Sequence, residues 1–218
     1  MKRRVGILIS GRGSNMMALI EAARAPHYPA HIALVISNRS DAPGLALARA
    51  AHVAALVIDH RDFATREAFD HAVEAALERE GVELVCHAGF MRIQSDAFAT
   101  RWLGRQLNIH PSLLPSFPGL NPHKQALEAG VCISGCTVHF VTPAVDCGPI
   151  VAQAAVPVVP GDTPGSLAAR ILKVEHRLYP FALKLAASGQ VRMEEKGVSL
   201  MASFNQSDCL FSPNPSTA

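Results

Sequence analysis

One short apolar run near the start of the chain, Val5-Gly-Ile-Leu-Ile9, limits the folds that are open to this sequence. A strand with one solvated face would alternate apolar and polar residues. This run does not alternate, so both faces of its sheet should be covered. A small polar loop, Ser10-Gly-Arg-Gly-Ser-Asn15, follows at once, and a helical pattern spans residues 16–23. A buried strand that leads through a short loop into a helix predicts a parallel sheet with helices packed on it.

The same alternation of strand and helix continues through the first half of the chain. Strands are expected at residues 32–37, 54–58, 84–88 and 106–109, and helices at residues 43–50 and 65–80. This rhythm predicts an α/β fold, with a doubly wound, mostly parallel open sheet and flanking helices.

Three prolines between residues 111 and 118 interrupt this rhythm. We expect a helix at residues 123–128 and then two strands, at residues 132–141 and 150–157, which can leave the parallel pattern.

A last long helix should begin at Asp162 or Thr163, with Pro164 in its first turn. Pro180 is expected to kink this helix. Apolar residues at helical spacing mark its buried face: Leu167, Ile171, Val174, Leu178 and Leu185. We expect one domain over residues 1–204 and a mobile, Ser- and Pro-rich tail over residues 205–218.

Composition excludes several classes of protein. The net charge of +2 comes without a basic run, so nucleic acid is not an expected partner. The N-terminal apolar stretch is too short for a signal peptide or a membrane span, so we expect no membrane contact. An odd number of cysteines argues against a disulfide framework and favours the cytoplasm. These are Cys86, Cys132, Cys136, Cys147 and Cys209.

The loop Gly11-Arg-Gly-Ser-Asn15 is the first candidate site. Glycines let the backbone approach a ligand, and the following helix offers free N–H groups and a positive dipole end, which together suit a phosphate. A dinucleotide fingerprint would need glycine where Met16 stands, and no Walker lysine follows, so a monophosphate is expected. The same loop also suits a plain strand-to-helix turn, with Ser14 or Asn15 capping the helix.

Asn108 and His110 form the second candidate, at the end of the strand expected at residues 106–109. Residues two apart in a strand share a face, so the amide and the imidazole should project together at the carboxyl end of the sheet. Such a pair suits a developing oxyanion and a proton transfer. Asp146 lies in a loop between two strands and would favour the imidazolium if it reached His110. As alternatives, the pair can satisfy a strand end, and Asp146 can fix a turn.

The loop Gly89-Phe-Met-Arg-Ile93 also follows a strand. Its apolar residues can line a ligand pocket, and Arg92 can meet a carboxylate; the alternative is that the loop packs its apolar side chains inward. We expect no metal site, because Cys132, Cys136 and His139 fall within a strand pattern and no second ligand pair lies nearby.

Taken together, these segments resemble the glycinamide ribonucleotide (phosphoribosylglycinamide) formyltransferase family, from Val5 to about Arg192. The resemblance rests on five stretches: Ser10-Gly-Arg-Gly-Ser-Asn15, Ala88-Gly-Phe-Met-Arg92, Leu107-Asn-Ile-His-Pro-Ser-Leu-Leu-Pro115, Phe117-Pro-Gly-Leu120 and Val138-His-Phe-Val-Thr-Pro-Ala-Val-Asp-Cys-Gly148. It implies a formyltransferase-like fold with a Rossmann-like N-terminal half. It also implies an enzyme of de novo purine biosynthesis that uses 10-formyltetrahydrofolate as co-substrate, without a metal.

The resemblance also implies residue roles. The substrate glycinamide ribonucleotide would be bound by Gly13, Ser14, Asn15 and Glu175. The folate would be bound by Arg66, Met91, Arg92, Ile93, Gln94 and Asn108. The catalytic set would be Asn108, His110 and Asp146. The implied mechanism is direct attack of the substrate amine on the formyl carbon, with Asn108 and His110 stabilising a tetrahedral intermediate.

Other functions stay open at this stage. Sister enzymes with the same chemistry are a methionyl-tRNA formyltransferase, which normally adds a basic C-terminal domain, and a formyltetrahydrofolate hydrolase, which typically adds an N-terminal domain. A non-catalytic phosphosugar-binding module is a more distant alternative. Family members often carry histidine where this chain has Asn121, which leaves the role of that position open. The chain is expected to be a monomer or a homodimer.

Overall fold

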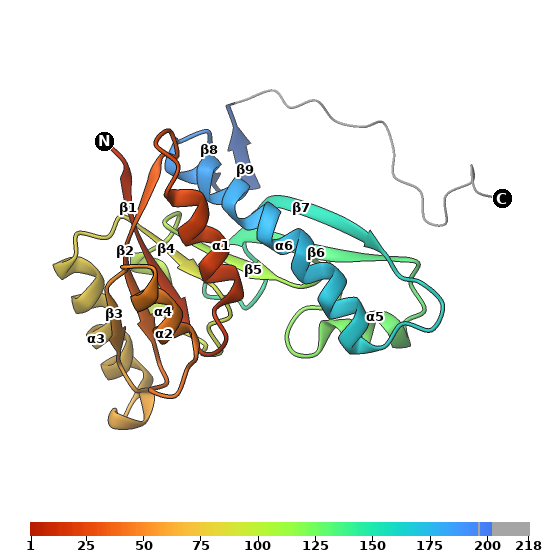
Figure 1. Cartoon of the computed structure of the whole chain (residues 1–218), viewed down its shortest axis with the longest axis horizontal. Helices are drawn as coiled ribbons and strands as arrows, with labels where there is room; N and C mark the ends of the chain where they lie inside the picture. The colour runs from red at the N-terminus through yellow and green to blue at the C-terminus, as the bar shows by residue number, and fades with distance from the viewer. Residues whose placement is uncertain (196, 202–218) are drawn as a thin grey trace.

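The computed structural model describes residues 1–195 and 197–201 and is built on a seven-stranded sheet (Figure 1). The strand order is β3-β2-β1-β4-β5-β6-β7. Strands β1 to β5 are parallel, whereas β6 and β7 are antiparallel to their neighbours. The strands are β1 (Arg3–Ile9), β2 (Ala30–Ser37), β3 (Ala55–Val57), β4 (Leu84–His87), β5 (Gln106–His110), β6 (Ile133–Phe140) and β7 (Ile150–Pro157). The predicted doubly wound, mostly parallel α/β sheet is therefore confirmed, including the departure from the parallel pattern near its end.

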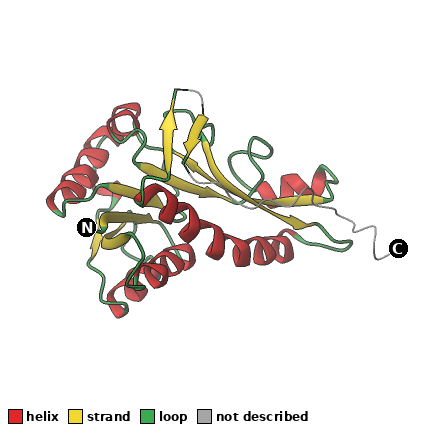
Figure 2. Ribbon diagram, turned by 90° about the horizontal axis from the view of Figure 1, so that it is seen from above, coloured by secondary structure: helices red, strands yellow, loops and turns green. Residues whose placement is uncertain are grey.

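Helices cover both faces of the sheet, as Figure 2 shows. The helices are α1 (Ser14–Ala23), α2 (Gly44–Ala50), α3 (Arg66–Arg79), α4 (Asp96–Arg101), α5 (Pro122–Glu128) and α6 (Pro164–Ala187), with a short 3-10 helix at His60–Asp62. Ile7 and Ile9 of β1 share one core with residues of α1, α2 and α6, whereas Leu8 packs into a second core with α3 and α4. The unbroken apolar run of β1 thus serves two cores, because successive side chains point to opposite faces.

Helix α6 begins as predicted. The Thr163 side chain accepts a hydrogen bond from the Ser166 N–H, and Pro164 occupies the first turn. Leu167, Ile171 and Leu185 are buried, Val174 and Leu178 are half-buried, and the helix runs on through Pro180. The buried face also includes Glu175 and Tyr179, which a pattern of aliphatic residues does not reveal.

Several short elements of the fold are not predicted by the sequence. Helix α4, the 3-10 helix and a hairpin of β8 (Val191–Glu194) and β9 (Gly197–Leu200) were not predicted. Each has too few residues to show a period, and four-residue strands pair only when the surrounding fold brings them together. The tail predicted over residues 205–218 and the domain end predicted at residue 204 lie outside the described residues.

The strand order fixes where a ligand can bind. The chain proceeds from β1 to β2 and β3 on one side and from β4 to β5 on the other, so the direction of winding reverses between β1 and β4. In open α/β sheets, ligands occupy the crevice at the carboxyl ends of the strands on either side of this point. The glycine loop, the loop after β4 and the end of β5 all lie at this edge.

Candidate active site

Asn108 and His110 project together from the last residues of β5. Leu107 and Ile109 belong to the core shared with α6, so the alternate residues Asn108 and His110 point to the opposite face. His110 is buried and Asn108 half-buried. The amide and the imidazole therefore share one face of the sheet at its carboxyl edge, as the sequence predicts.

The imidazole of His110 lies between two oxygen acceptors. Its Nδ1 atom is 3.4 Å from Oδ2 of Asp146, and its Nε2 atom is 3.0 Å from the carbonyl oxygen of Phe117. A carboxylate and a carbonyl can only accept, so the imidazolium is the form of His110 that can donate to both. Asp146, which sequence reasoning could not place, does reach His110.

Asp146 is held by its own loop and by a neighbouring one. Its backbone is left-handed, with φ of 53°, which is uncommon outside glycine but tolerated by aspartate. Its Oδ2 atom accepts a hydrogen bond of 2.9 Å from the Gly119 N–H. The carboxylate thus joins the loop after β5 to the loop between β6 and β7, and both loops are needed to build the site.

Sequence reasoning did not assign His139 to this site. Its Nε2 atom lies 3.1 Å from Nδ2 of Asn108 and 3.7 Å from Oδ1 of Asp146. Burial lowers the pKa of His139, and this effect is only partly offset by the Phe140 carbonyl and by Asp146. The signal that could have found His139 is the antiparallel pairing of β5 with β6, which sets it opposite Asn108.

The glycine loop ends at a helix N-terminus whose side chains do not cap it. Gly13 is the N-cap residue, with φ of 74°, and α1 has no side-chain capping bond. Capping by Ser14 or Asn15 is therefore not observed, and the first N–H groups of α1 stay available to an anion. A methyl group on Gly13 would lie 2.9 Å from Cα of Gly44, so glycine is also required by this close approach.

Asn15 and Glu175 meet although they come from opposite ends of the chain. Nδ2 of Asn15 donates to Oε2 of Glu175 at 2.7 Å, while Oδ1 of Asn15 is buried with no hydrogen-bond partner among the described residues. Burial raises the pKa of Glu175, and the bond from Asn15 and the nearby His110 oppose that shift. The bond from Asn15 thus joins the start of α1 to the middle of α6.

The loop after β4 presents the residues predicted to bind folate. Met91 and Ile93 are 66% and 57% exposed, which is unusual for large apolar side chains and leaves them free to line a flat ligand. Arg92 is exposed, and Oε1 of Gln94 is buried without a partner in the described part of the chain. One buried polar atom without a partner and two exposed apolar side chains thus lie on the same loop.

Arg66 is the first residue of α3, the helix to which the loop after β4 is attached. The buried carboxylate of Asp70, one turn along from Arg66, accepts a 2.6 Å hydrogen bond from the Ser95 N–H. Burial raises the pKa of Asp70, whereas the hydrogen bonds from Ser95 and, to a smaller extent, the Arg66 charge lower it. The end of the loop is therefore anchored to the same helix that begins with Arg66.

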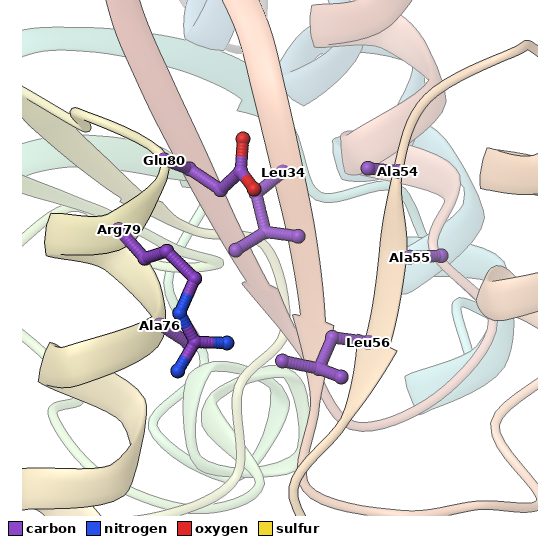
Figure 3. A pocket seen from close by; sticks show the side chains of 7 residues that line it. All are labelled: Leu34, Ala54, Ala55, Leu56, Ala76, Arg79 and Glu80. Atoms are coloured by element: carbon purple, nitrogen blue, oxygen red, sulfur yellow. The ribbon is translucent and has the colours of Figure 1, made fainter.

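Two surface hollows lie away from this crevice. One, of about 230 Å³, lies near the amino end of β3 (Figure 3) and is lined by Leu34, Ala54, Ala55, Leu56, Ala76, Arg79 and Glu80. The other, of about 300 Å³, includes Arg3, Arg105 and Arg192 at the amino ends of β1 and β4. Neither touches a predicted site residue.

Residues 1–195 and 197–201 contain no group of three or more His, Cys, Asp or Glu side chains arranged to hold a metal ion. Within the same residues, every helix is too short or too polar to span a bilayer.

Comparisons with known proteins agree with this geometry. The family model described as formyl transferase matches residues 3–183. The phosphoribosylglycinamide formyltransferase of Escherichia coli K12 is 43% identical over 194 residues, which cover 89% of this chain and 92% of that protein. The chain belongs to the phosphoribosylglycinamide formyltransferase family. Its fold matches the glycinamide ribonucleotide transformylase 1 of Symbiobacterium toebii with a TM-score of 0.89 and 50% identity, over 91% of this chain and 94% of the other.

Longer relatives carry the same family domain. The trifunctional purine biosynthetic protein adenosine-3 of Bos taurus is 52% identical over 196 residues, or 90% of this chain. The chain spans about a fifth of the length of that protein and of its human and chicken counterparts. Membership in the formyltransferase family, which the sequence motifs suggested, is thus confirmed.

Proposed function

We propose that this chain transfers the formyl group of 10-formyltetrahydrofolate to the amine of glycinamide ribonucleotide. The observation that carries the proposal is the convergence of Asn108, His110 and Asp146 at the carboxyl edge of the sheet, beside an uncapped helix N-terminus. Asn108 and His110 share one face of the sheet at this edge. Two such donors suit an oxygen that gains negative charge, and the helix N-terminus suits a phosphate.

Each substrate has its own side of the crevice. Gly13, Ser14 and Asn15 would hold the phosphate of the ribonucleotide, and Glu175 would accept from its hydroxyl groups. The folate, which supplies the formyl group on a ring-linked nitrogen, would lie along the loop after β4, with Arg66, Met91, Arg92, Ile93 and Gln94 around it. The formyl group would then lie next to Asn108.

The residues of the chain act on the formyl oxygen. Asn108 donates from its amide nitrogen, and His110 donates from Nε2 once its bond to the Phe117 carbonyl opens. The carboxylate of Asp146, 3.4 Å from Nδ1 of His110, would stabilise positive charge that develops on the ring. The substrate amine attacks as the neutral form, a carbon–nitrogen bond forms to it, and the bond from the formyl carbon to the folate nitrogen breaks. The proton lost by the amine passes to that folate nitrogen, so no oxidant, metal or covalent enzyme adduct is required.

A coupled assay tests the proposal. Purified protein is mixed with glycinamide ribonucleotide and 10-formyltetrahydrofolate, and the folate product and the formylated nucleotide are measured together. We expect equal amounts of both. Asn108→Ala and His110→Ala should each lower turnover by about 10²–10³-fold, because each removes one donor to the oxyanion.

The assay separates this function from its alternatives. Folate product without formylated nucleotide would indicate a hydrolase. Neither product, from protein that melts cooperatively, would indicate another formyl acceptor or a binding module. If both alanine variants turn over at the rate of the parent, the proposed role of Asn108 and His110 is wrong, even if the chain transfers the formyl group.

A further inference from the structure

Strand pairing sets three polar side chains in one row across the sheet. His87 of β4 lies opposite Asn108 of β5, and Asn108 lies opposite His139 of β6. Directly paired residues of neighbouring strands share a face, so all three point away from α6. His139 is 2% exposed and has no place in the chemistry derived above. Its position directly beside Asn108 suggests a role in that chemistry.

The neighbours of His139 determine which ring nitrogen carries hydrogen. Nδ1 lies 2.9 Å from the carbonyl oxygen of Phe140, which can only accept, so Nδ1 is the protonated nitrogen. Burial lowers the pKa of His139, which favours the neutral ring. Nε2 then has a free lone pair, and the Asn108 amide nitrogen at 3.1 Å must be the donor.

We propose that His139 is a positioning residue that fixes the orientation of the Asn108 amide through its bare Nε2 atom. An amide nitrogen carries two hydrogens, and His139 takes one of them. The second is left for the crevice, because Asn108 is half-buried and Nδ2 has no other hydrogen bond within the described residues. A reversed amide would turn its carbonyl oxygen toward His139 and could not present that hydrogen. The statement that the second hydrogen meets the formyl oxygen rests on the proposed function.

The charged and titratable groups around His139 have opposite effects on the protonation of its Nε2 atom. Asp146 Oδ1, 3.7 Å from Nε2, favours a proton there, whereas burial and His110 disfavour it. His87, along the row, has a pKa lowered to about 4 by burial and is neutral near pH 7. A proton on Nε2 would donate to Asp146, and Asn108 would have to turn over to keep a bond. The orientation of Asn108 therefore depends on a neutral His139.

Four variants test the proposal through kcat and KM. His139→Leu removes the acceptor in a buried site that tolerates an apolar side chain, and we expect kcat to fall about 10–100-fold with both KM values within about twofold. His139→Gln offers an amide oxygen near the position of Nε2 and should recover most of that loss. His87→Leu is the matched control, since its ring bonds Gln106 and not Asn108; it should change stability more than kcat. Asn108→Ala combined with His139→Leu should be no slower than Asn108→Ala alone.

Nitrogen-15 NMR of the histidine rings tests the same arrangement without an activity assay. The spectra are recorded on protein without substrates and show which ring nitrogen of His139 carries a proton. His139, assigned by its loss in His139→Gln, should show a protonated Nδ1 and a bare Nε2 at neutral pH. A protonated Nε2, parent-like kcat in His139→Leu, or an equal further loss in the Asn108→Ala background would overturn the proposal. If the parent protein transfers no formyl group, the proposed function fails, while the ring signals still decide whether His139 can hold the amide.

Discussion

Nδ2 of Asn15, in the first turn of α1, donates to Oε2 of Glu175, in the middle of α6, across a separation of 160 residues in the chain. The bond joins the first turn of α1, which follows the glycine loop, to a buried carboxylate that lies far along the sequence. Glu175 is only 5% exposed, and burial raises its pKa. A carboxylate kept in such a place at a cost in stability is typical of a binding residue.

We expect Glu175→Gln to be at least as stable as the parent at neutral pH, because it removes a buried charge. A raised folded-state pKa means that the folded protein binds a proton more tightly than the unfolded chain does. The stability that comes from this proton is present in acid and is lost as pH rises through the folded pKa. The variant should therefore gain in Tm relative to the parent as pH rises from about 4 to 7. Its KM for the ribonucleotide should rise about tenfold or more.

The Glu175→Gln prediction is checked by melting curves across this pH range together with substrate titrations. An unchanged KM would exclude contact of Glu175 with the ribonucleotide. A Tm difference that shrinks as pH rises would contradict the assigned direction of the pKa shift.

Two glycines of the loop between β1 and α1 should respond differently to alanine. Gly13 has a left-handed backbone, and an added methyl group would meet Gly44 at 2.9 Å, whereas nothing lies within 4 Å of a methyl group on Gly11. Gly13→Ala should cost about 1–3 kcal/mol in stability and raise the KM for the ribonucleotide, because strain displaces the N–H groups of α1. Gly11→Ala is the control and should change stability by less than about 1 kcal/mol. If Gly13→Ala and Gly11→Ala lower the free energy of unfolding equally in denaturant melts, the backbone conformation of Gly13 is not the cause of the loss.

The positions of Asn108 and His110 on β5 were predictable because local rules determine them. A strand-end pair at positions 108 and 110 must share a face, and a doubly wound sheet must gather its strand ends at one edge. The glycine loop was predicted in the same way, from two glycines between a strand and a helix, and it does lead from β1 into α1; phosphate binding there stays a prediction. Here sequence alone indicated both the residues and their common location.

Other parts of the site depend on pairing over longer distances or on backbone groups. His139 meets Asn108 only because β6 returns antiparallel to β5 after more than twenty residues, and no local pattern fixes that register. The carbonyl of Phe117 and the N–H of Gly119, which hold His110 and Asp146, belong to no side-chain motif. Phe117 also has φ of 56°, a conformation that its residue type does not predict.

Asn121 shows the reverse case, in which structure explains an unexpected residue. Its backbone is left-handed, with φ of 57° and ψ of 42°, directly before Pro122 at the start of α5. Asparagine is among the few residues other than glycine that adopt this conformation readily. Backbone conformation alone thus gives a reason for asparagine at this position.

Asp146→Asn removes the charge of this residue and keeps the size and shape of its side chain. The amide can still accept from the Gly119 N–H, so the two loops should stay joined, but the carboxylate charge beside the His110 ring is lost. We expect kcat to fall by about 10²-fold or more, with a Tm close to that of the parent. Steady-state kinetics at saturating concentrations of both substrates, with melting curves alongside, provide the measurement. A kcat within threefold of the parent, from folded protein, would mean that the charge of Asp146 is dispensable.

His87 should make the fold sensitive to acid. Burial lowers its pKa from 6.5 to about 4, so the folded protein keeps His87 neutral where the unfolded chain already binds a proton. Stability from this group is therefore full above pH 6.5 and is lost as pH falls toward 4, by on the order of 3 kcal/mol. His87→Gln keeps a bonding partner for Gln106 without titrating, and should weaken the pH dependence of the free energy of unfolding. His71→Gln, at an exposed position on α3, should leave it unchanged. Urea melts at pH 4.5 and 7 would show this, and equal slopes for the parent and His87→Gln would rule His87 out as the acid-sensitive group.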